Sequence, residues 1–248
     1  MSNRYGTTPT GPGEYRDSAA SLPRPKEAAT LIVVRAGDRP TILMGKRAAT
    51  HRFMPNKFVF PGGRLDAIDQ RLRIRGELSD PVMSRLRKAT RKDVTDRKLR
   101  GLALAAIRET FEETGLVIGR PSSQSVKTAH PVWQHYLGHG VEPPLAHMDF
   151  IARAITPPYR TRRFDTRFFL VHDEFIHNDP EQITDASGEL NELHWLTLSD
   201  ARDLDLPAVT RWAIDLVEER IQLTPREQLR QPAPFMRFVK GEAVSLEL

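Results

Sequence analysis

The chain has 248 residues, 39% of them hydrophobic, which suffices for one sizeable core with insertions or for two small domains, and we expect one domain. It contains no cysteine, which excludes disulfide bonds, a thiolate nucleophile and zinc sites built on cysteine. Its formal charge of +5 favours anionic partners, and the lack of a secretion signal or an eighteen-residue apolar run predicts a cytoplasmic protein without membrane association.

Residues 1–27 are rich in Gly, Pro, Ser and Thr, and we expect a mobile leader there. Segments 30–35 and 41–47 are apolar and flank the turn residues Gly-Asp-Arg-Pro at 37–40, which predicts a β-hairpin. The apolar run at 58–60 predicts a third short strand.

The third strand leads into Pro61-Gly62-Gly63, which predicts a tight turn. Proline fixes φ, and the two glycines let the backbone approach a ligand closely. On its own, this pattern would indicate an ordinary strand-ending turn.

A long segment from about residue 64 to residue 100 follows, and it is strongly basic. Between residues 71 and 98 its cations are Arg71, Arg73, Arg75, Arg85, Arg87, Lys88, Arg91, Lys92, Arg97 and Lys98, and its acids are Glu77, Asp80, Asp93 and Asp96. One hypothesis is a lid that attracts phosphate groups, either of a small substrate or of an RNA backbone. The alternative is a solvated pair of helices, and the sequence leaves both open.

The sequence Arg-Glu-Thr-Phe-Glu-Glu-Thr-Gly at 108–115 predicts the end of a helix with three acids on one face. Glu109, Glu112 and Glu113 lie at i, i+3 and i+4, where like charges repel by about 0.2–0.5 kcal/mol per pair. A bound cation would remove that cost. Because all the ligands are oxygens, we expect Mg²⁺ or Mn²⁺.

The same helix is expected to be buried on both faces. The apolar residues opposite the acids are Leu104, Ile107 and Phe111. Ala105 and Ala106 lie on the acidic side, where small side chains allow another layer to approach. Arg108 is placed to hold Glu112 at i+4, and Gly115 supplies a left-handed helix end.

The rest of the chain predicts further strands and helices. We expect a short helix at 132–137, strands at 147–156, 166–172 and 195–198, and a final amphipathic helix that begins at Pro207. The run at 235–240 predicts either an added edge strand or a subunit contact in a homodimer. His130, His135 and His139 do not have zinc-ligand spacing, and Trp133, Trp195 and Trp212 are expected in the core rather than as base-stacking platforms.

The strand, the Pro-Gly-Gly turn and the Arg-Glu-x-x-Glu-Glu-x-Gly helix together resemble the signature of the Nudix hydrolases, which cleave diphosphates joined to another moiety. The resemblance implies an α/β fold: a Nudix α/β/α sandwich with a mixed β-sheet and a basic helical insert. Its domain would span 28–224, followed by a C-terminal extension at 225–248. The signature departs from the usual pattern because Arg100 stands where a glutamate is usual, and Asp66 or Asp69 is a candidate replacement.

The long insert also resembles the branch that includes the peroxisomal coenzyme A diphosphatases. Three further segments resemble that branch, and they lie at 154–158, 163–169 and 189–196. The expected substrate is therefore coenzyme A or an acyl derivative. The alternatives are ADP-ribose, NADH, a dinucleoside polyphosphate or an RNA cap, or a catalytically weak Nudix-like regulator that binds a nucleotide. A nucleic-acid partner is not favoured.

The resemblance implies roles for individual residues. The metal ligands would be Glu109, Glu112, Glu113, the Gly62 carbonyl and Glu189, with Glu192 and Glu174 as alternatives to Glu189. Glu109 is the first choice for general base, and Arg108 is expected in the catalytic group. Substrate-binding candidates are Gly63, Arg47, Arg64 and Arg163; a guanidinium matches phosphate oxygens in pairs, although each arginine is equally compatible with a surface role.

Overall fold

The computed structural model describes residues 23–47, 57–124, 126–178, 190–228, 230–239 and 242–248. Its strands are β1 (Lys26–Arg35), β2 (Thr41–Arg47), β3 (Phe58–Val59), β4 (Gly62–Arg64), β5 (Arg120–Pro121), β6 (Val141–Glu142), β7 (Asp149–Ile155), β8 (Phe164–His172), β9 (Leu190–Thr197), β10 (Pro234–Val239) and β11 (Glu242–Glu247). Its helices are α1 (Ala67–Arg71), α2 (Asp80–Arg87), α3 (Asp96–Thr114), α4 (Pro131–Gly138), α5 (Leu198–Asp203), α6 (Ala208–Ile221) and α7 (Pro225–Gln228), with 3₁₀ turns at Leu145–His147 and Asp173–Phe175.

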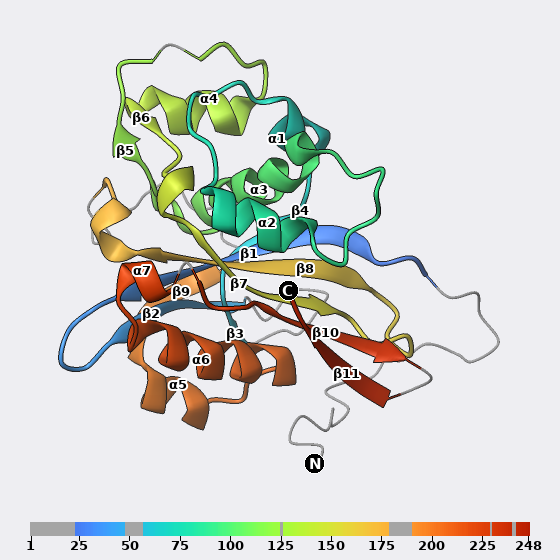
Figure 1. Cartoon of the computed structure of the whole chain (residues 1–248). Helices are drawn as coiled ribbons and strands as arrows, with labels where there is room; N and C mark the ends of the chain where they lie inside the picture. Colours follow the sequence, from blue (N-terminus) through green and yellow to red (C-terminus); the bar gives the residue numbers. More distant parts are fainter. Residues whose placement is uncertain (1–22, 48–56, 125, 179–189, 229, 240–241) are drawn as a thin grey trace.

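A nine-stranded mixed sheet runs through the described part of the chain (Figure 1). Its main path is β11-β10-β7-β8-β1-β2-β3, while β4 pairs with β1 and β9 pairs with β2. The β1–β8 and β7–β10 pairs are parallel, and the other pairs are antiparallel. Strand β1 lies between β8 and β2 in the sheet. Its residues Leu31, Ile32, Val33 and Val34 are all fully buried, as expected for a strand covered on both faces.

Helices cover both faces of the sheet (Figure 1). On one face Leu31 and Val33 of β1 belong to a core shared with α3. On the other face Ile32 and Val34 belong to a core shared with α6, including Trp212. This division follows from the period-2 alternation of side chains along a strand. The predicted hairpin and the predicted short helix, α4, are confirmed. The amphipathic helix predicted from Pro207 is α6, which begins at Ala208 with Pro207 as its N-cap and is followed by α7.

Three predicted boundaries need correction. Gly62 and Gly63 do not form a turn: they belong to β4, which pairs with Thr30 and Ala29 of β1. The strand expected at 195–198 begins at Leu190, and Leu198 instead starts α5. The run at 235–240 becomes β10, which lies between β7 and β11 and is therefore an interior strand rather than an edge strand.

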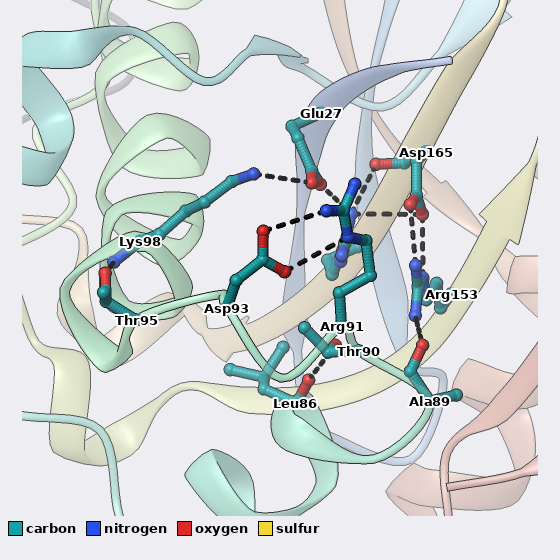
Figure 2. Close-up of polar contacts among 11 residues, drawn as sticks. Glu27, Leu86, Ala89, Thr90, Arg91, Asp93, Thr95, Lys98, Arg153 and Asp165 are labelled. Carbon is teal, nitrogen blue, oxygen red and sulfur yellow. Dashed lines mark hydrogen bonds and ion pairs between the residues drawn. The ribbon is translucent and has the colours of Figure 1, made fainter. Parts of the chain in front are cut away.

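The insert packs as part of the protein core. The apolar side chains buried there are Leu72, Ile74, Leu78, Val82 and Leu86. Several of its cations also form ion pairs: Arg87 pairs with Asp96 at the surface. Arg91 pairs with Asp93, and Lys98 with Glu27 of β1 (Figure 2). A phosphate-attracting role is therefore best tested by substituting the exposed cations of the insert. Deleting the whole insert would expose the core of the protein.

The loop between α2 and α3 contains Ala89 at φ 52°, and no other non-glycine residue in the described ranges has positive φ. Its carbonyl accepts a hydrogen bond from Nη1 of Arg153 at 3.0 Å, and Asp165 binds the same guanidinium through both carboxylate oxygens (Figure 2). The buried arginine therefore holds the left-handed backbone in place.

We expect Ala89→Gly to stabilise the protein, because glycine adopts positive φ without the steric cost that alanine has. The expected gain is about 1 kcal/mol, or a rise in Tm of about 2–4 °C, measured by thermal unfolding. Ala243→Gly, on the exposed strand β11, is the control and should lower the Tm slightly. A lower Tm in both variants would contradict the assignment of strain to Ala89.

Within the described ranges, no helix combines the length and the apolar character needed to span a lipid bilayer.

Candidate active site

The three acids lie on α3, and the sequence accounts for the residues at which this helix begins and ends. The helix begins after Thr95, whose side chain accepts a hydrogen bond from the Lys98 amide, and it ends at Gly115, with φ 70°. Ala105 and Ala106 are fully buried beside the acids, as Leu104 is on the other face. The prediction of a helix buried on both faces is confirmed.

The three predicted glutamates lie near donors of the protein itself. Oε1 of Glu109 is 2.9 Å from Nη1 of Arg108, and Oε2 of Glu112 is 3.2 Å from the same nitrogen. Oε2 of Glu113 accepts a hydrogen bond from the Gly62 amide at 3.0 Å. The predicted i,i+4 contact of Arg108 with Glu112 is thus present, and Arg108 also joins Glu109 to the group.

Strand β4 brings its backbone directly against these acids. A Cβ atom on Gly63 would overlap the Glu109 carboxylate, so a side chain there would require that carboxylate to move. Gly62 has φ 153°, and a Cβ on it would lie 2.5 Å from the Ala29 carbonyl oxygen. The glycines therefore let the backbone of β4 lie close to Glu109 and to β1, while the predicted close approach to a ligand stays a prediction.

Arg108 is also bound by Asp69, which is fully buried. Nε and Nη2 of Arg108 donate to Oδ1 and Oδ2 of Asp69 at 2.8 and 3.0 Å. Nη2 also donates to the Arg64 carbonyl at 3.0 Å. Of the two candidate replacements for the usual first glutamate, Asp69 therefore contacts the arginine, while Asp66 caps the N-terminus of α1.

Burial raises the pKa of Glu109 above its ordinary value, and the nearby charge of Glu112 adds to that effect, while Arg108 opposes it. Burial alone would lower the pKa of Arg108, but its hydrogen bonds and charge interaction with Asp69 raise it overall, so the guanidinium stays charged. The site therefore combines a permanent cation with a carboxylate that is more basic than usual.

The donor chemistry fits a hard divalent cation. The side chains are carboxylates only, and burial together with the nearby charge of Glu112 raises the pKa of Glu109, a cost that a bound cation would remove. In the part of the chain that is described, no three His, Asp or Glu residues are grouped closely enough to hold a metal ion by themselves. Glu109, Glu112 and Glu113 therefore do not form a complete metal site among the described residues, and further oxygens, such as those of substrate phosphates, would have to complete the coordination.

The other predicted residues are spread more widely. Glu189 lies outside the described residues, as does the side chain of Glu192, and Glu174 is exposed in a 3₁₀ turn. Arg64 is exposed at the end of β4, where its backbone carbonyl accepts a hydrogen bond from Arg108, and Arg47 is half-buried at the end of β2. The roles of these residues stay predictions.

Arg163 has local backbone partners. Its Nε donates to the Thr156 carbonyl at 3.0 Å and its Nη1 to the Pro23 carbonyl at 3.1 Å. These contacts join the β7–β8 connection to the segment before β1. Its predicted role in phosphate binding would require these contacts to be shared with the substrate.

Sequence reasoning missed the contact between Asp69 and Trp133. Trp133 is fully buried, as predicted, and its Nε1 donates to Oδ1 of Asp69 at 3.0 Å. Trp212 is also in the core, whereas Trp195 is half-buried with the Arg35 guanidinium 4.0 Å from its ring centroid. The only sequence signal for the Trp133 contact is a tryptophan in an expected core, which does not identify its partner.

No protein-family model matches the chain. It is 27% identical over 191 residues to "Putative nudix hydrolase 7" of Caenorhabditis elegans, a match that covers 72% of this chain and 53% of that protein. The chain thus spans about half the length of this curated relative.

Among solved structures, the crystal structure of a NUDIX hydrolase from Alicyclobacillus acidocaldarius matches with a TM-score of 0.60 and 24% identity. The match covers 85% of this chain and 98% of that structure. This similarity confirms the predicted mixed α/β fold. The two comparisons support the resemblance to the Nudix hydrolase family, and neither concerns the coenzyme A branch.

Proposed function

We propose that this chain, which has the fold of the Nudix hydrolases, is a metal-dependent hydrolase that cleaves the diphosphate linkage of a nucleoside diphosphate derivative. The observation that carries this proposal is the acidic end of α3, where Glu109, Glu112 and Glu113 lie against the Gly62–Gly63 backbone. A binding module would have no reason to keep three mutually repelling carboxylates beside a strand on which a side chain would displace one of them.

The residues of the site have separate tasks in this proposal. Arg108 holds Glu109 and Glu112, and the Gly62 amide holds Glu113, so all three acids present oxygens from fixed positions. When bound at these oxygens, Mg²⁺ or Mn²⁺ neutralises the diphosphate and lowers the pKa of a coordinated water. Arg64, which is exposed and whose backbone carbonyl accepts a hydrogen bond from Arg108, would meet phosphate oxygens at the edge of the same site.

Hydrolysis adds one water molecule across one bridge between two phosphorus atoms. The water oxygen bonds to phosphorus, the bond from that phosphorus to the bridging oxygen breaks, and the bridging oxygen leaves with the other phosphate. We assign the proton of the attacking water to Oε2 of Glu109, because Oε1 faces Arg108. In this proposal the Glu109 carboxylate acts as the general base.

For the substrate, we propose coenzyme A or an acyl-coenzyme A. The support is the sequence resemblance of the segments at 154–158, 163–169 and 189–196 to the coenzyme A diphosphatases, together with the long insert. Cleavage of coenzyme A at its diphosphate would release adenosine 3′,5′-bisphosphate and 4′-phosphopantetheine. ADP-ribose, NADH and dinucleoside polyphosphates are the alternatives that share the same linkage.

The test is a substrate screen with the purified full chain. Coenzyme A, acetyl-coenzyme A, ADP-ribose, NADH, diadenosine tetraphosphate and capped RNA are each incubated with Mg²⁺ or Mn²⁺, and products are identified by mass spectrometry. We expect turnover of coenzyme A to exceed that of the others and to stop when EDTA removes the cation. Efficient cleavage of another compound would overturn the proposed substrate assignment. Tight binding without any cleavage would favour a regulator that binds a nucleotide.

A further inference from the structure

The carboxylate of Asp69 accepts four hydrogen bonds although no part of it reaches solvent. Oδ1 accepts from Nε of Arg108 at 2.8 Å and from Nε1 of Trp133 at 3.0 Å. Oδ2 accepts from Nη2 of Arg108 at 3.0 Å and from the Asp66 amide at 2.9 Å. A buried charge satisfied by this many donors occupies one defined position.

This arrangement determines how Arg108 is oriented. Asp69 takes the Nε and Nη2 edge of the guanidinium, and a two-bond pair of this kind fixes the plane of the group. The remaining nitrogen, Nη1, then lies 2.9 Å from Glu109 and 3.2 Å from Glu112. Because Nη1 is shared, neither glutamate forms a two-bond pair with the arginine.

The position of Asp69 depends in turn on α3. Arg100, which stands where the family signature has a glutamate, donates to the carbonyls of Leu72 and Ile74 at 3.2 and 3.1 Å and to that of Gly76 at 3.3 Å. These bonds hold the segment that follows α1. At Gly101 a Cβ would lie 3.2 Å from the Gln70 backbone, so α1 contacts α3 closely. Arg100 and Asp69 are thus parts of one contact between the insert and α3.

We propose that Asp69 is a positioning residue: by holding one edge of Arg108, it keeps Glu109 and Glu112 available to a divalent cation. The inference rests on the proposed metal-dependent function. Without the Asp69 charge, the buried guanidinium would turn to another carboxylate that can accept two bonds, and Glu109 and Glu112, at 2.9 and 3.2 Å from Nη1, are at hand. A glutamate paired in that way would have fewer oxygens to offer a metal ion.

The test is Mn²⁺ uptake by the metal-free full chain, measured by titration calorimetry for wild type and Asp69→Asn. Asparagine keeps the size of the side chain and can still accept from Trp133, but it removes the charge. We expect Mn²⁺ affinity to fall about 10–100-fold, as for other residues that orient metal ligands. Activity should fall strongly at limiting Mn²⁺ and recover in large part at saturating Mn²⁺, which a general loss of structure would not do.

Asp165→Asn is the matched control, because Asp165 forms the same two-bond pair with Arg153, also buried, on strands β7 and β8 away from the acids. It should lower stability while leaving Mn²⁺ affinity at the wild-type value. Trp133→Phe, which keeps the Asp69–Arg108 pair, should change affinity by less than about tenfold.

If Asp69→Asn is folded by circular dichroism and binds Mn²⁺ like wild type, the inference is wrong while the proposed function stands. If Asp69→Asn does not fold, Arg108→Lys provides the same test, because lysine lacks the planar fork that reaches Asp69 and the glutamates together. Wild-type Mn²⁺ affinity in Arg108→Lys would equally overturn the inference. Absence of Mn²⁺ uptake by the wild type would instead overturn the proposed metal site.

Discussion

Replacing Glu112 or Glu113 with glutamine is expected to leave the fold intact and to lower kcat/KM by about 10²-fold or more, because a cation loses a charged ligand at the reacting diphosphate. Glu112 is partly exposed, so its pair with Arg108 contributes at most about 1 kcal/mol to stability. At position 113 a glutamine oxygen can still accept the hydrogen bond from the Gly62 amide. Steady-state hydrolysis and thermal unfolding of both variants measure the two effects.

Glu247→Gln is the control for this pair, because Glu247 is exposed on β11, away from α3. It should retain wild-type turnover and wild-type Tm. Normal turnover in Glu112→Gln or Glu113→Gln would show that catalysis does not use that carboxylate. A large drop in Tm would instead show that the acid has a structural role that the contacts do not indicate.

Gly63→Ala is expected to reduce activity by about 10²-fold, because the added methyl group would occupy the space of the Glu109 carboxylate. The contact is with the end of a flexible side chain, so the carboxylate can move away and the backbone of β4 can stay in place. The expected signature is therefore a low kcat with a Tm close to that of wild type. Hydrolysis assays and thermal unfolding on the same preparation measure both quantities.

Alanine variants of two other glycines serve as comparisons for Gly63→Ala. A Cβ on Gly138 would meet nothing within 4 Å, so Gly138→Ala should be fully active. Gly62→Ala would place its Cβ against the backbone of β1 at a positive φ, so this variant should lose stability as well as activity. If Gly63→Ala is as active as Gly138→Ala, the Glu109 carboxylate either has another position or is not required.

The sequence was sufficient for the features that depend on local spacing. The helix that carries Glu109, Glu112 and Glu113, its end at Gly115 and the contact of Arg108 with Glu112 all follow from the 3.6-residue period. The first hairpin followed from apolar runs on either side of a turn sequence. The fold class followed from the order of these elements together with the family resemblance.

Features that depend on contacts distant in sequence were not predictable in the same way. Gly62 and Gly63 are in a strand because β1 provides the hydrogen-bonding partners, and a three-residue strand has no periodicity of its own. The pair of Asp69 with Arg108 joins residues on different helices, and either Asp66 or Asp69 was compatible with the spacing. The sequence left a phosphate-attracting lid and a solvated pair of helices open for the insert, yet Leu72, Val82 and Leu86 are buried in the core that contains α3.

The parallel pairing of β1 with β8 has a consequence for how the polypeptide acquires its structure during synthesis. Ile32 leaves the ribosome long before its neighbour Leu170 emerges. Until then β1, whose residues 31–34 are fully buried in the folded protein, has an unsatisfied edge, and such exposed edges favour aggregation. The protein should accordingly refold slowly for its size, and nascent chains that stop before Phe164 should depend on chaperones to stay in solution.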